Sequence, residues 1–149
     1  MNIAIVGATG NVGRKLLEVL ERTNFEFREI YLIASDKSVG KKITFKNKNY
    51  SVIGLGDFDF GKVTLAFFSA GSSIAEKWAP IAAKKTIVID NSKYFRMDKE
   101  IPLVVPEVNG EALKFYKNKN IIANANCSTI QLVLALKPLH DQLDRKSVV

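Results

Sequence analysis

The feature that most constrains the fold is a glycine-rich turn between an apolar strand and an amphipathic helix. Asn2 to Val6 form a short apolar run, and Gly7-Ala8-Thr9-Gly10-Asn11-Val12-Gly13 follows with the spacing G-x-x-G-x-x-G. Arg14 to Arg22 then show helical periodicity. Glycine permits a tight turn, close backbone approach to a pyrophosphate and close helix–strand packing. An ordinary βα turn is the alternative, but the context favours a dinucleotide-binding loop.

The rest of the chain continues to alternate between strand and helix patterns. Strands are predicted at residues 27–34, 63–69, 86–90 and 120–124, and helices at 75–83, 108–116 and 127–136. Residues 42–55 predict a hairpin or an irregular sheet edge. Residues 91–107 are expected to form a long loop, and loops of that length tend to be functional. We therefore predict an α/β fold, a Rossmann-like, doubly wound and mostly parallel sheet with helices on both faces.

Composition narrows the class of protein. The 149 residues correspond to one ordinary domain, with the balance of 47% apolar and 25% charged residues that soluble globular proteins show. No stretch approaches the roughly 18 apolar residues of a membrane span, and no secretory signal is apparent. The single cysteine fits a reducing compartment. We therefore expect a cytoplasmic protein with no membrane partner.

The chain is basic, with a formal charge of +7 and a pI near 9.5. Such a charge can indicate nucleic-acid binding. The lysines are dispersed, however, and the densest cluster (Lys41, Lys42, Lys46, Lys48) lies in a turn-rich stretch without a stacking platform. We expect no nucleic-acid partner, because dispersed lysines are typical of a solvated surface. The alternative is that the positive field favours anionic small molecules.

The end of the second predicted strand bears on the choice of cofactor. The sequence there is Ala34-Ser35-Asp36-Lys37-Ser38. An acidic side chain would bind a ribose hydroxyl and favour NAD, whereas hydroxyls and a cation would hold a 2′-phosphate and favour NADP. Ser35, Lys37 and Ser38 favour NADP and Asp36 favours NAD, so we predict NADP. A solvated turn pair is the alternative interpretation of Asp36 and Lys37.

The one cysteine, Cys127, lies where the last predicted strand passes into the last helix. The unpaired amides and the positive dipole end of a helix start stabilise a thiolate over a thiol, which suits a nucleophile. The alternative is an inert buried cysteine. Asn126 is expected either to orient the thiol or to cap the helix.

Four motifs together resemble the aspartate-semialdehyde dehydrogenase family. They are the Gly7 to Gly13 loop, Phe68-Ser69-Ala70-Gly71, the run from Val88 through Asp90-Asn91-Ser92-Lys93-Tyr94-Phe95-Arg96-Met97-Asp98 to Pro106-Glu107-Val108-Asn109, and Asn124-Ala125-Asn126-Cys127-Ser128-Thr129. Their order and spacing match the family over essentially the whole chain to His140. Lys93 and Tyr94 depart from it, because small residues are common there.

The resemblance implies reversible NADPH-dependent reduction of 4-aspartyl phosphate to aspartate semialdehyde, a step toward lysine, threonine and methionine. Cys127 would displace phosphate and hold the acyl group as a thioester, and Arg96 would bind the phosphate. Asn91 and Asn126 would support the site, and no metal is expected. The cofactor-binding residues would be Gly7, Thr9, Gly10, Asn11, Val12, Gly13, Ser35, Lys37, Ser38, Ser69, Ala70 and Gly71. Another acyl-phosphate reductase, such as N-acetyl-gamma-glutamyl-phosphate reductase, is the alternative that the third motif disfavours.

A cysteine of this kind needs a base and a group that holds the substrate carboxylate. The family supplies a histidine, an arginine and a glutamine from a second domain. His140 is not assigned as the base, because 13 helical residues would place it about 20 Å from Cys127. We therefore predict an NADP-binding Rossmann-like domain at 1–128. Residues 129–149 would begin a helix, interrupted at Pro138, that leads into a catalytic and dimerisation domain missing from this chain.

Three hypotheses follow for such a chain. It is a truncated or split polypeptide with doubtful activity of its own, or a separately encoded C-terminal half completes it, or it is a stand-alone or vestigial dinucleotide-binding module. Full-length family members are expected to be homodimers. Without the returning chain, the domain is expected to expose an apolar patch and either self-associate or repack its last helix from Ile130 onward.

Overall fold

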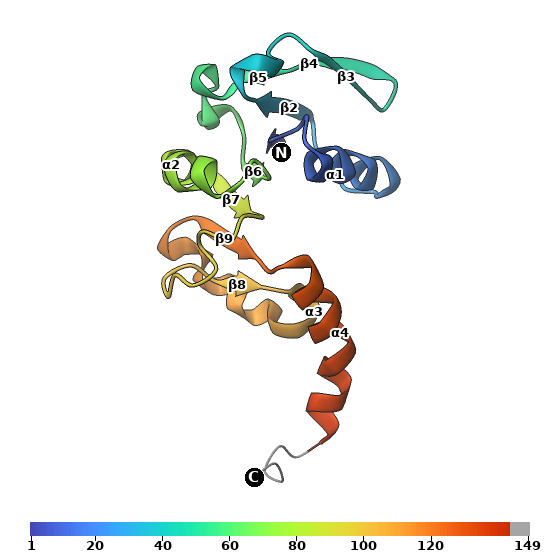
Figure 1. Cartoon of the computed structure of the whole chain (residues 1–149), viewed down its shortest axis with the longest axis vertical. Coiled ribbons are helices and arrows are strands. Elements are labelled where there is room, and N and C mark those ends of the chain that lie inside the picture. Colours follow the sequence, from blue (N-terminus) through green and yellow to red (C-terminus); the bar gives the residue numbers. More distant parts are fainter. Residues whose placement is uncertain (144–149) are drawn as a thin grey trace.

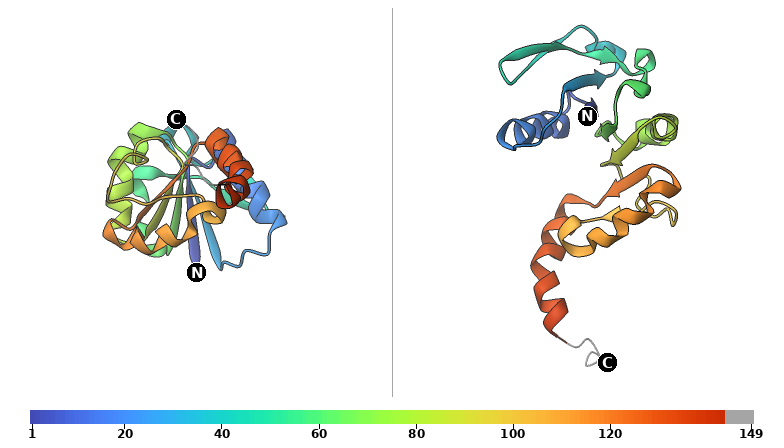
Figure 2. Two further views of the ribbon diagram at one scale, coloured as in Figure 1. Left: turned by 90° about the horizontal axis from the view of Figure 1, so that it is seen from below. Right: turned by 180° about the vertical axis from the view of Figure 1, so that it is seen from behind.

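The computed structural model describes residues 1–143, which form a parallel sheet with helices on both faces (Figures 1 and 2). The sheet has seven strands in the order β5-β2-β1-β6-β7-β9-β8, and each neighbouring pair is parallel. Their bounds are β1 Asn2–Val6, β2 Glu29–Ala34, β5 Ile53–Gly54, β6 Leu65–Phe68, β7 Ile87–Asp90, β8 Leu103–Val104 and β9 Ile121–Asn124. The strand order reverses at β1. The Rossmann-like, doubly wound fold is therefore confirmed.

Helices and short turns connect these strands. The α-helices of residues 1–143 are α1 Asn11–Arg22, α2 Ser72–Ala83, α3 Pro106–Asn109 and α4 Cys127–Gln142. The 3₁₀ segments are η1 Asp36–Ser38, η2 Leu55–Asp57, η3 Phe60–Lys62 and η4 Gly110–Asn118. The predicted hairpin is present as β3 Lys42–Phe45 and β4 Lys48–Ser51. Its turn residues, Lys46 and Asn47, both have positive φ, as a two-residue type I′ turn requires.

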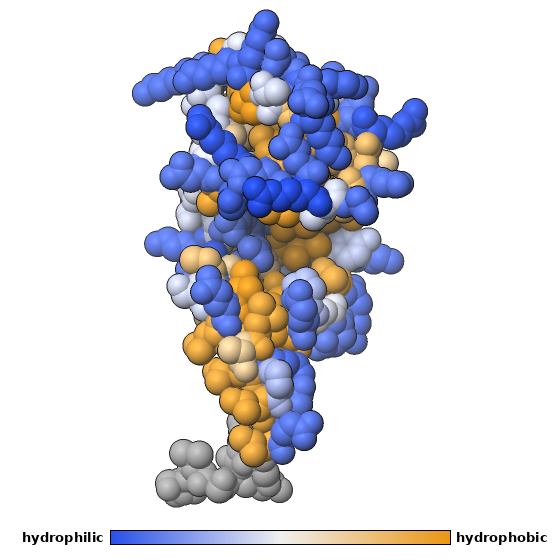
Figure 3. Space-filling view, turned by 90° about the vertical axis from the view of Figure 1, so that its right-hand side faces the viewer, coloured by the Kyte–Doolittle hydropathy of each residue, from blue (hydrophilic) through white to orange (hydrophobic). Residues whose placement is uncertain are grey.

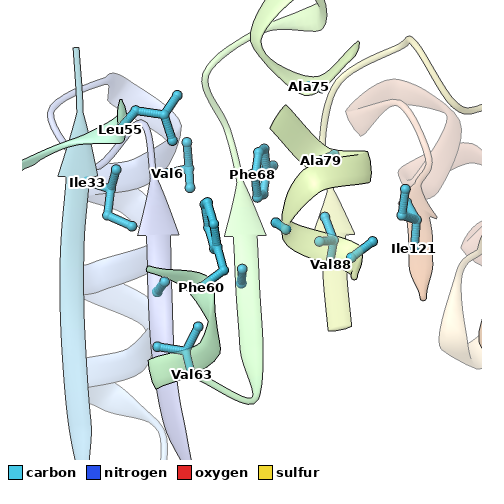
Figure 4. Close-up of a cluster of buried hydrophobic side chains, with 14 of the residues drawn as sticks. Val6, Ile33, Leu55, Phe60, Val63, Phe68, Ala75, Ala79, Val88 and Ile121 are labelled. Carbon is cyan, nitrogen blue, oxygen red and sulfur yellow. The ribbon is translucent and has the colours of Figure 1, made fainter. Parts of the chain in front are cut away.

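Successive residues of each strand point to opposite faces of the sheet and build two hydrophobic cores. On one face, Val6 and Phe68 belong to the same cluster as Ala79 of α2 (Figure 4). On the other face, Ile5 belongs to a cluster with Leu17 of α1. Burial on both faces fixes the strands in register, and this places their carboxyl ends along one edge.

The predicted loop at 91–107 is not wholly a loop, because it contains β8. This strand pairs with β9 at the edge of the sheet, and the backbone N–H of Ala123 donates to the carbonyl of Pro102 at 2.9 Å. A strand of two residues is too short to give a recognisable alternation in the sequence. β8 therefore forms because its residues pair with β9 in the folded chain.

The helix predicted at 108–116 is instead α3 followed by the 3₁₀ segment η4. The side chain of Asn109 explains where α3 ends: Oδ1 accepts the backbone N–H of Val105 and Nδ2 donates to the carbonyl of Leu103, both at 2.8 Å. These bonds hold Asn109 at φ −144° and ψ 39°, outside the α-helical region. The side-chain hydrogen bonds to the loop therefore end the α-helix, although the helical periodicity of the sequence continues.

The last helix is longer than predicted, because α4 continues through Pro138 to Gln142. The proline removes one N–H, which would otherwise bond to the carbonyl of Leu134. Leu134 itself lies on the surface, 39% exposed. The end of the predicted 129–149 segment, residues 144–149, lies outside the described residues.

Beyond its contact with α3, α4 leads away from the sheet (Figure 1). Leu132, Leu136 and Leu139 are exposed on it, and so is Leu143 at its C-cap. Apolar surface accordingly runs along the lower part of the molecule in Figure 3. The expected apolar patch is thus present, and the helix is not repacked onto the sheet. No helix within residues 1–143 is long and apolar enough to cross a membrane.

Candidate active site

The predicted site residues follow strands whose carboxyl ends meet at one edge of the sheet. The glycine loop follows β1, Ser69 follows β6, Arg96 lies in the segment after β7, and Cys127 follows β9. In open α/β sheets, ligands bind outside these ends, at the point where the strand order reverses. The topology therefore brings together segments that are far apart in the sequence.

The glycine loop turns sharply against two neighbouring segments. Gly7 has a φ of +89°, and its N–H and that of Ala8 donate to the carbonyl of Ile33 at 2.8 and 3.1 Å. A Cβ on Gly7 would lie 2.8 Å from the carbonyl carbon and oxygen of Ser69. A Cβ on Gly13 would lie 2.3 Å from the carbonyl oxygen of Gly7. Backbone packing therefore requires glycine at both positions.

The first turn of α1 offers amide groups to an anion. Gly10 is the N-cap of α1, and within the described chain no side chain caps it and no acidic residue lies in the first turn. The first amides of a helix have no intrahelical acceptor, and this end of the helix dipole is positive. Asn11, Val12 and Gly13 occupy this turn. This end of α1 therefore suits a pyrophosphate group.

A cavity of about 340 Å³ lies beside the glycine loop, within the size range of small-molecule sites. It is lined by Val6, Gly7, Thr9, Gly10, Ala34, Ser35, Leu55, Ser69, Ala70 and Ile74. Ser69 also fixes this wall, because its Oγ–H donates to the carbonyl of Val6 at 3.0 Å. Six of the predicted cofactor residues are not among the lining residues: Asn11, Val12 and Gly13 in α1, Lys37 and Ser38 in η1, and Gly71 at the cap of α2.

Two apolar lining residues, Leu55 and Ile74, were not foreseen from the sequence. Leu55 begins η2 directly after β5, and Ile74 lies in the first turn of α2. Both residues follow the carboxyl end of a strand, and this position in the sequence could have marked them as candidates for the binding site. Their side chains supply apolar walls beside the polar loop, an arrangement common in pockets for planar ring ligands.

The turn after β2 presents some of the predicted 2′-phosphate contacts to solvent. Ser35 and Lys37 are exposed, and Ser35 lines the cavity. Ser38 is largely buried within η1, so its hydroxyl is poorly placed to reach a ligand. Asp36 is exposed as well, and its Oδ1 lies 3.5 Å from the position of a Cβ on Gly54.

Arg96 is held by backbone carbonyls from two strand ends. Its Nε donates to the carbonyl of Asn124 at 3.0 Å and its Nη2 donates to the carbonyl of Asn91 at 3.1 Å. The two asparagines are also joined, since Nδ2 of Asn124 donates to Oδ1 of Asn91 at 2.8 Å. Asn124 ends β9, three residues before Cys127. The network therefore ties the predicted phosphate ligand to the segment that carries the thiol.

Asp90, the last residue of β7, is completely buried beneath this network. Its Oδ1 accepts the backbone N–H of Ser92 at 3.1 Å and its Oδ2 accepts the Oγ–H of Ser92 at 2.6 Å. Burial raises the pKa of the Asp90 carboxyl, and the bonds from Ser92 and the charge of Arg96 oppose that rise. Asp90 could have been recognised in the sequence as a site candidate, because it is a charged residue at the end of an apolar strand.

Cys127 is exposed and is the first residue of α4. The burial that the alternative interpretation assumed is therefore wrong. Asn126 caps the helix, because its Oδ1 accepts the backbone N–H of Ser128 at 3.0 Å. Of the two roles considered for Asn126, capping is the one that the structure shows.

No partner base for the thiol is evident on the described part of the chain. The one histidine of the sequence, His140, lies near the other end of α4 and lines an apolar groove with Val108 and Leu136. At 1.5 Å per residue, the helix separates it from Cys127 by about 20 Å. Among residues 1–143, no group of three or more His, Cys, Asp or Glu side chains is placed to hold a metal ion.

Comparison with known proteins agrees with this architecture. Residues 2–116 match a family model described as semialdehyde dehydrogenase, NAD binding domain. The chain is 54% identical to the aspartate-semialdehyde dehydrogenase of Aquifex aeolicus over 149 residues, which cover 99% of this chain and 44% of that protein. The chain thus spans less than half the length of the curated relatives it matches.

Two solved structures show the same fold. Aspartate semialdehyde dehydrogenase II of Vibrio cholerae, complexed with ASA, matches with a TM-score of 0.92 at 52% identity, over 94% of this chain and 46% of that chain. Aspartate semialdehyde dehydrogenase with NADP from Candida albicans matches with a TM-score of 0.78 at 30% identity, over 95% of this chain and 47% of that chain.

Proposed function

The chain belongs to the semialdehyde dehydrogenase family of NAD-binding domains, and on this basis we propose that it is the part of an aspartate-semialdehyde dehydrogenase that binds NADP and carries the nucleophile. One observation carries the proposal: the glycine loop, Arg96 and Cys127 follow strands whose carboxyl ends share one sheet edge. Relatives at 46 to 54% identity that bear the name aspartate-semialdehyde dehydrogenase support the choice of substrate.

In the proposed reaction, the Cys127 sulfur bonds to the acyl carbon of 4-aspartyl phosphate. The bond from that carbon to the phosphate oxygen breaks, which leaves a thioester on Cys127 and free phosphate. Arg96 would bind the phosphoryl oxygens, because its guanidinium is a planar, permanently charged fork. When bound, the nicotinamide would supply a hydride, which together with one proton converts the thioester into the aldehyde and the free thiol.

The residues present fit a nicotinamide dinucleotide, and we propose NADP over NAD. The first-turn amides of α1 would hold the pyrophosphate, and Leu55 and Ile74 would contact the adenine ring in the cavity. Exposed Lys37 and Ser35 would hold the 2′-phosphate, although Asp36 between them is exposed as well. The structure with NADP from Candida albicans supports this choice.

We also propose that residues 1–128 form the cofactor domain and that α4 leads into a second, catalytic and dimerisation domain. The base and the group for the substrate carboxylate would come from that domain, whether on the same polypeptide or a separate one. The exposed thiol of Cys127 suits a reducing compartment, so we place the completed homodimeric enzyme in the cytoplasm.

A dinucleotide-binding module without catalysis is the second candidate function. The observation that favours it is the distance of about 20 Å along α4 between Cys127 and His140, the only histidine. In this case the cavity beside the glycine loop would bind the dinucleotide, and the thiol would have no role in turnover.

The test combines binding with turnover. We expect the 149-residue chain to bind NADPH in calorimetry and to show no phosphate-dependent NADP reduction with aspartate semialdehyde. Turnover should appear when a polypeptide corresponding to the remaining part of a longer relative is added, and it should vanish with Cys127→Ser, which should still bind NADPH.

NADPH binding without turnover in any mixture would favour the dinucleotide-binding module without catalysis. Turnover with N-acetylglutamate semialdehyde instead would favour the related reductase, and failure to bind any dinucleotide would overturn both proposals.

A further inference from the structure

Asp90 is a buried carboxylate that none of the roles assigned above uses. Burying an ionisable group is costly unless hydrogen bonds satisfy it. Both Asp90 oxygens are bonded to Ser92, and the Oγ of Ser92 in turn accepts the backbone N–H of Tyr94 at 3.1 Å. The carboxylate therefore fixes the course of the backbone from the end of β7 to Tyr94.

The segment that Asp90 fixes leads directly to Arg96. A guanidinium has five N–H donors, and two of those of Arg96 are bonded to the carbonyls of Asn124 and Asn91. Asn91 lies between Asp90 and Ser92, so the bonds that fix this turn also fix the carbonyl that accepts from Nη2. The remaining N–H groups are not used in these two contacts.

We propose that Asp90 is a positioning residue, which holds the guanidinium of Arg96 through Ser92 and Asn91 so that its remaining N–H groups face an anion. The role of that anion as the substrate phosphoryl group rests on the proposed function. Asp90 touches neither substrate nor cofactor in this proposal. It acts through a turn that is completed before any ligand arrives, which lowers the cost of ordering Arg96 on binding.

An alternative role for Asp90 is purely electrostatic. It predicts a change in anion binding opposite in sign to the one that the positioning role predicts. A negative charge near Arg96 weakens the attraction of that arginine for an anion, so its removal should strengthen anion binding. If Asp90 instead positions the guanidinium, its removal should weaken anion binding. The variant Asp90→Asn keeps nearly the same shape and removes the charge, so the sign of its effect separates the two roles.

The experiment follows the Nη2–H signals of Arg96 by NMR in the ¹⁵N-labelled 149-residue chain, because Nη2 donates to the carbonyl of Asn91. Arg96→Lys is used to identify those signals. We expect Asp90→Asn and Ser92→Ala each to speed exchange of the Nη2 protons with water about tenfold, the ratio for the loss of one hydrogen bond. Asn109→Ala is the matched control, because it breaks the bonds to Val105 and Leu103 in the neighbouring loop and none in this network. It should leave the exchange rate unchanged.

Titration with inorganic phosphate supplies the second measurement. We expect Asp90→Asn to weaken phosphate binding about tenfold relative to the unaltered chain, and Ser92→Ala to do the same. If Asp90→Asn does not fold, Ser92→Ala decides, since it keeps the buried carboxylate. Unchanged Nη2–H exchange in a folded variant, or stronger phosphate binding, would overturn the positioning role. If phosphate fails to bind even the unaltered chain while exchange responds as expected, the positioning role stands and the phosphate role of Arg96 is refuted.

Discussion

Gly13 faces Gly7 so closely that a Cβ on Gly13 would lie 2.3 Å from the carbonyl oxygen of Gly7. Backbone atoms of a helix start and of the preceding turn cannot move apart without displacing the loop. We therefore expect Gly13→Ala to lower the free energy of unfolding by about 1–3 kcal/mol, the usual cost of overpacking. NADPH binding should weaken by more than tenfold because the first-turn amides of α1 shift with the loop.

Chemical denaturation and NADPH calorimetry check this expectation. Gly56→Ala is the control, since a Cβ there would meet nothing within 4 Å. It should change neither stability nor binding. A Gly13→Ala protein with unaltered stability and NADPH affinity would show that the loop adapts.

We expect the preference for NADPH over NADH to depend on Lys37. Lys37→Ala removes a cation from the exposed turn after β2, so NADPH binding should weaken about tenfold while NADH binding stays the same. Lys41→Ala removes the same charge from a nearby exposed position and should affect both cofactors little. Equal weakening of NADPH and NADH by Lys37→Ala would contradict a specific contact with the 2′-phosphate.

Local periodicity was sufficient to predict the fold class. The apolar runs that become β1, β6, β7 and β9 are bounded by turns, and parallel order follows from the helices between them. The glycine loop and Cys127 were each predicted at a strand-to-helix junction, and in a parallel sheet such junctions share one edge.

Features that depend on tertiary contacts could not be predicted in this way. Leu55 lines the cavity because β5 joins the sheet beside β2, and β8 exists only as a partner of β9. The hydrogen bonds of Arg96 to carbonyls of Asn91 and Asn124 join residues that are far apart in the sequence and have no pattern of their own. Asn109 ends α3 through side-chain bonds that helical periodicity does not contain.

Asn126 should control the first turn of the helix that carries Cys127. Asn126→Ala removes the acceptor for the N–H of Ser128, and loss of an N-cap costs about 0.5–2 kcal/mol. Hydrogen exchange of that amide should therefore accelerate about 2- to 30-fold. Asn126→Asp, which can also cap, should leave the rate nearly unchanged. Equal acceleration in both variants would mean that capping is not the role of Asn126.

Asp90 should give the stability of the domain a pH dependence of recognisable sign. Its native pKa is raised above the ordinary value of 3.8, chiefly by burial, so the folded state binds the proton more tightly than the unfolded chain does. Its contribution to stability is therefore fully present below the unfolded pKa of about 3.9 and is lost as pH rises through the native pKa. The difference in unfolding free energy between the unaltered chain and Asp90→Asn should shrink as pH rises from 4.

Asp59 provides a control of opposite sign. Its pKa is lowered by the hydrogen bond from Lys85 and the backbone bond from Gly61, so its contribution is present above the unfolded pKa and is lost as pH falls. The difference between the unaltered chain and Asp59→Asn should therefore grow with pH. Denaturation at several pH values measures both trends, and a difference for Asp90→Asn that grows with pH would show that its native pKa is not raised.

The exposed leucines of α4 should make this chain self-associate. Leu132, Leu136, Leu139 and Leu143 follow one another at intervals of four, three and four residues and are 58, 46, 55 and 64% exposed. This spacing places Leu132, Leu136 and Leu139 along one face of the helix, with Leu143 at its C-cap. Exposed apolar faces of this kind favour association. We expect concentration-dependent sedimentation and strong binding of an apolar dye.

Replacement of two of these leucines tests the origin of the association. Leu136→Lys with Leu139→Lys should reduce both dye binding and association, because charges on the shared face repel and remain hydrated. Val39→Lys changes a residue that is 49% exposed but lies outside α4, and it should leave both measurements unchanged. If the unaltered chain sediments as a monomer at all concentrations and binds no dye, the apolar face of α4 does not act as an association surface at this chain length.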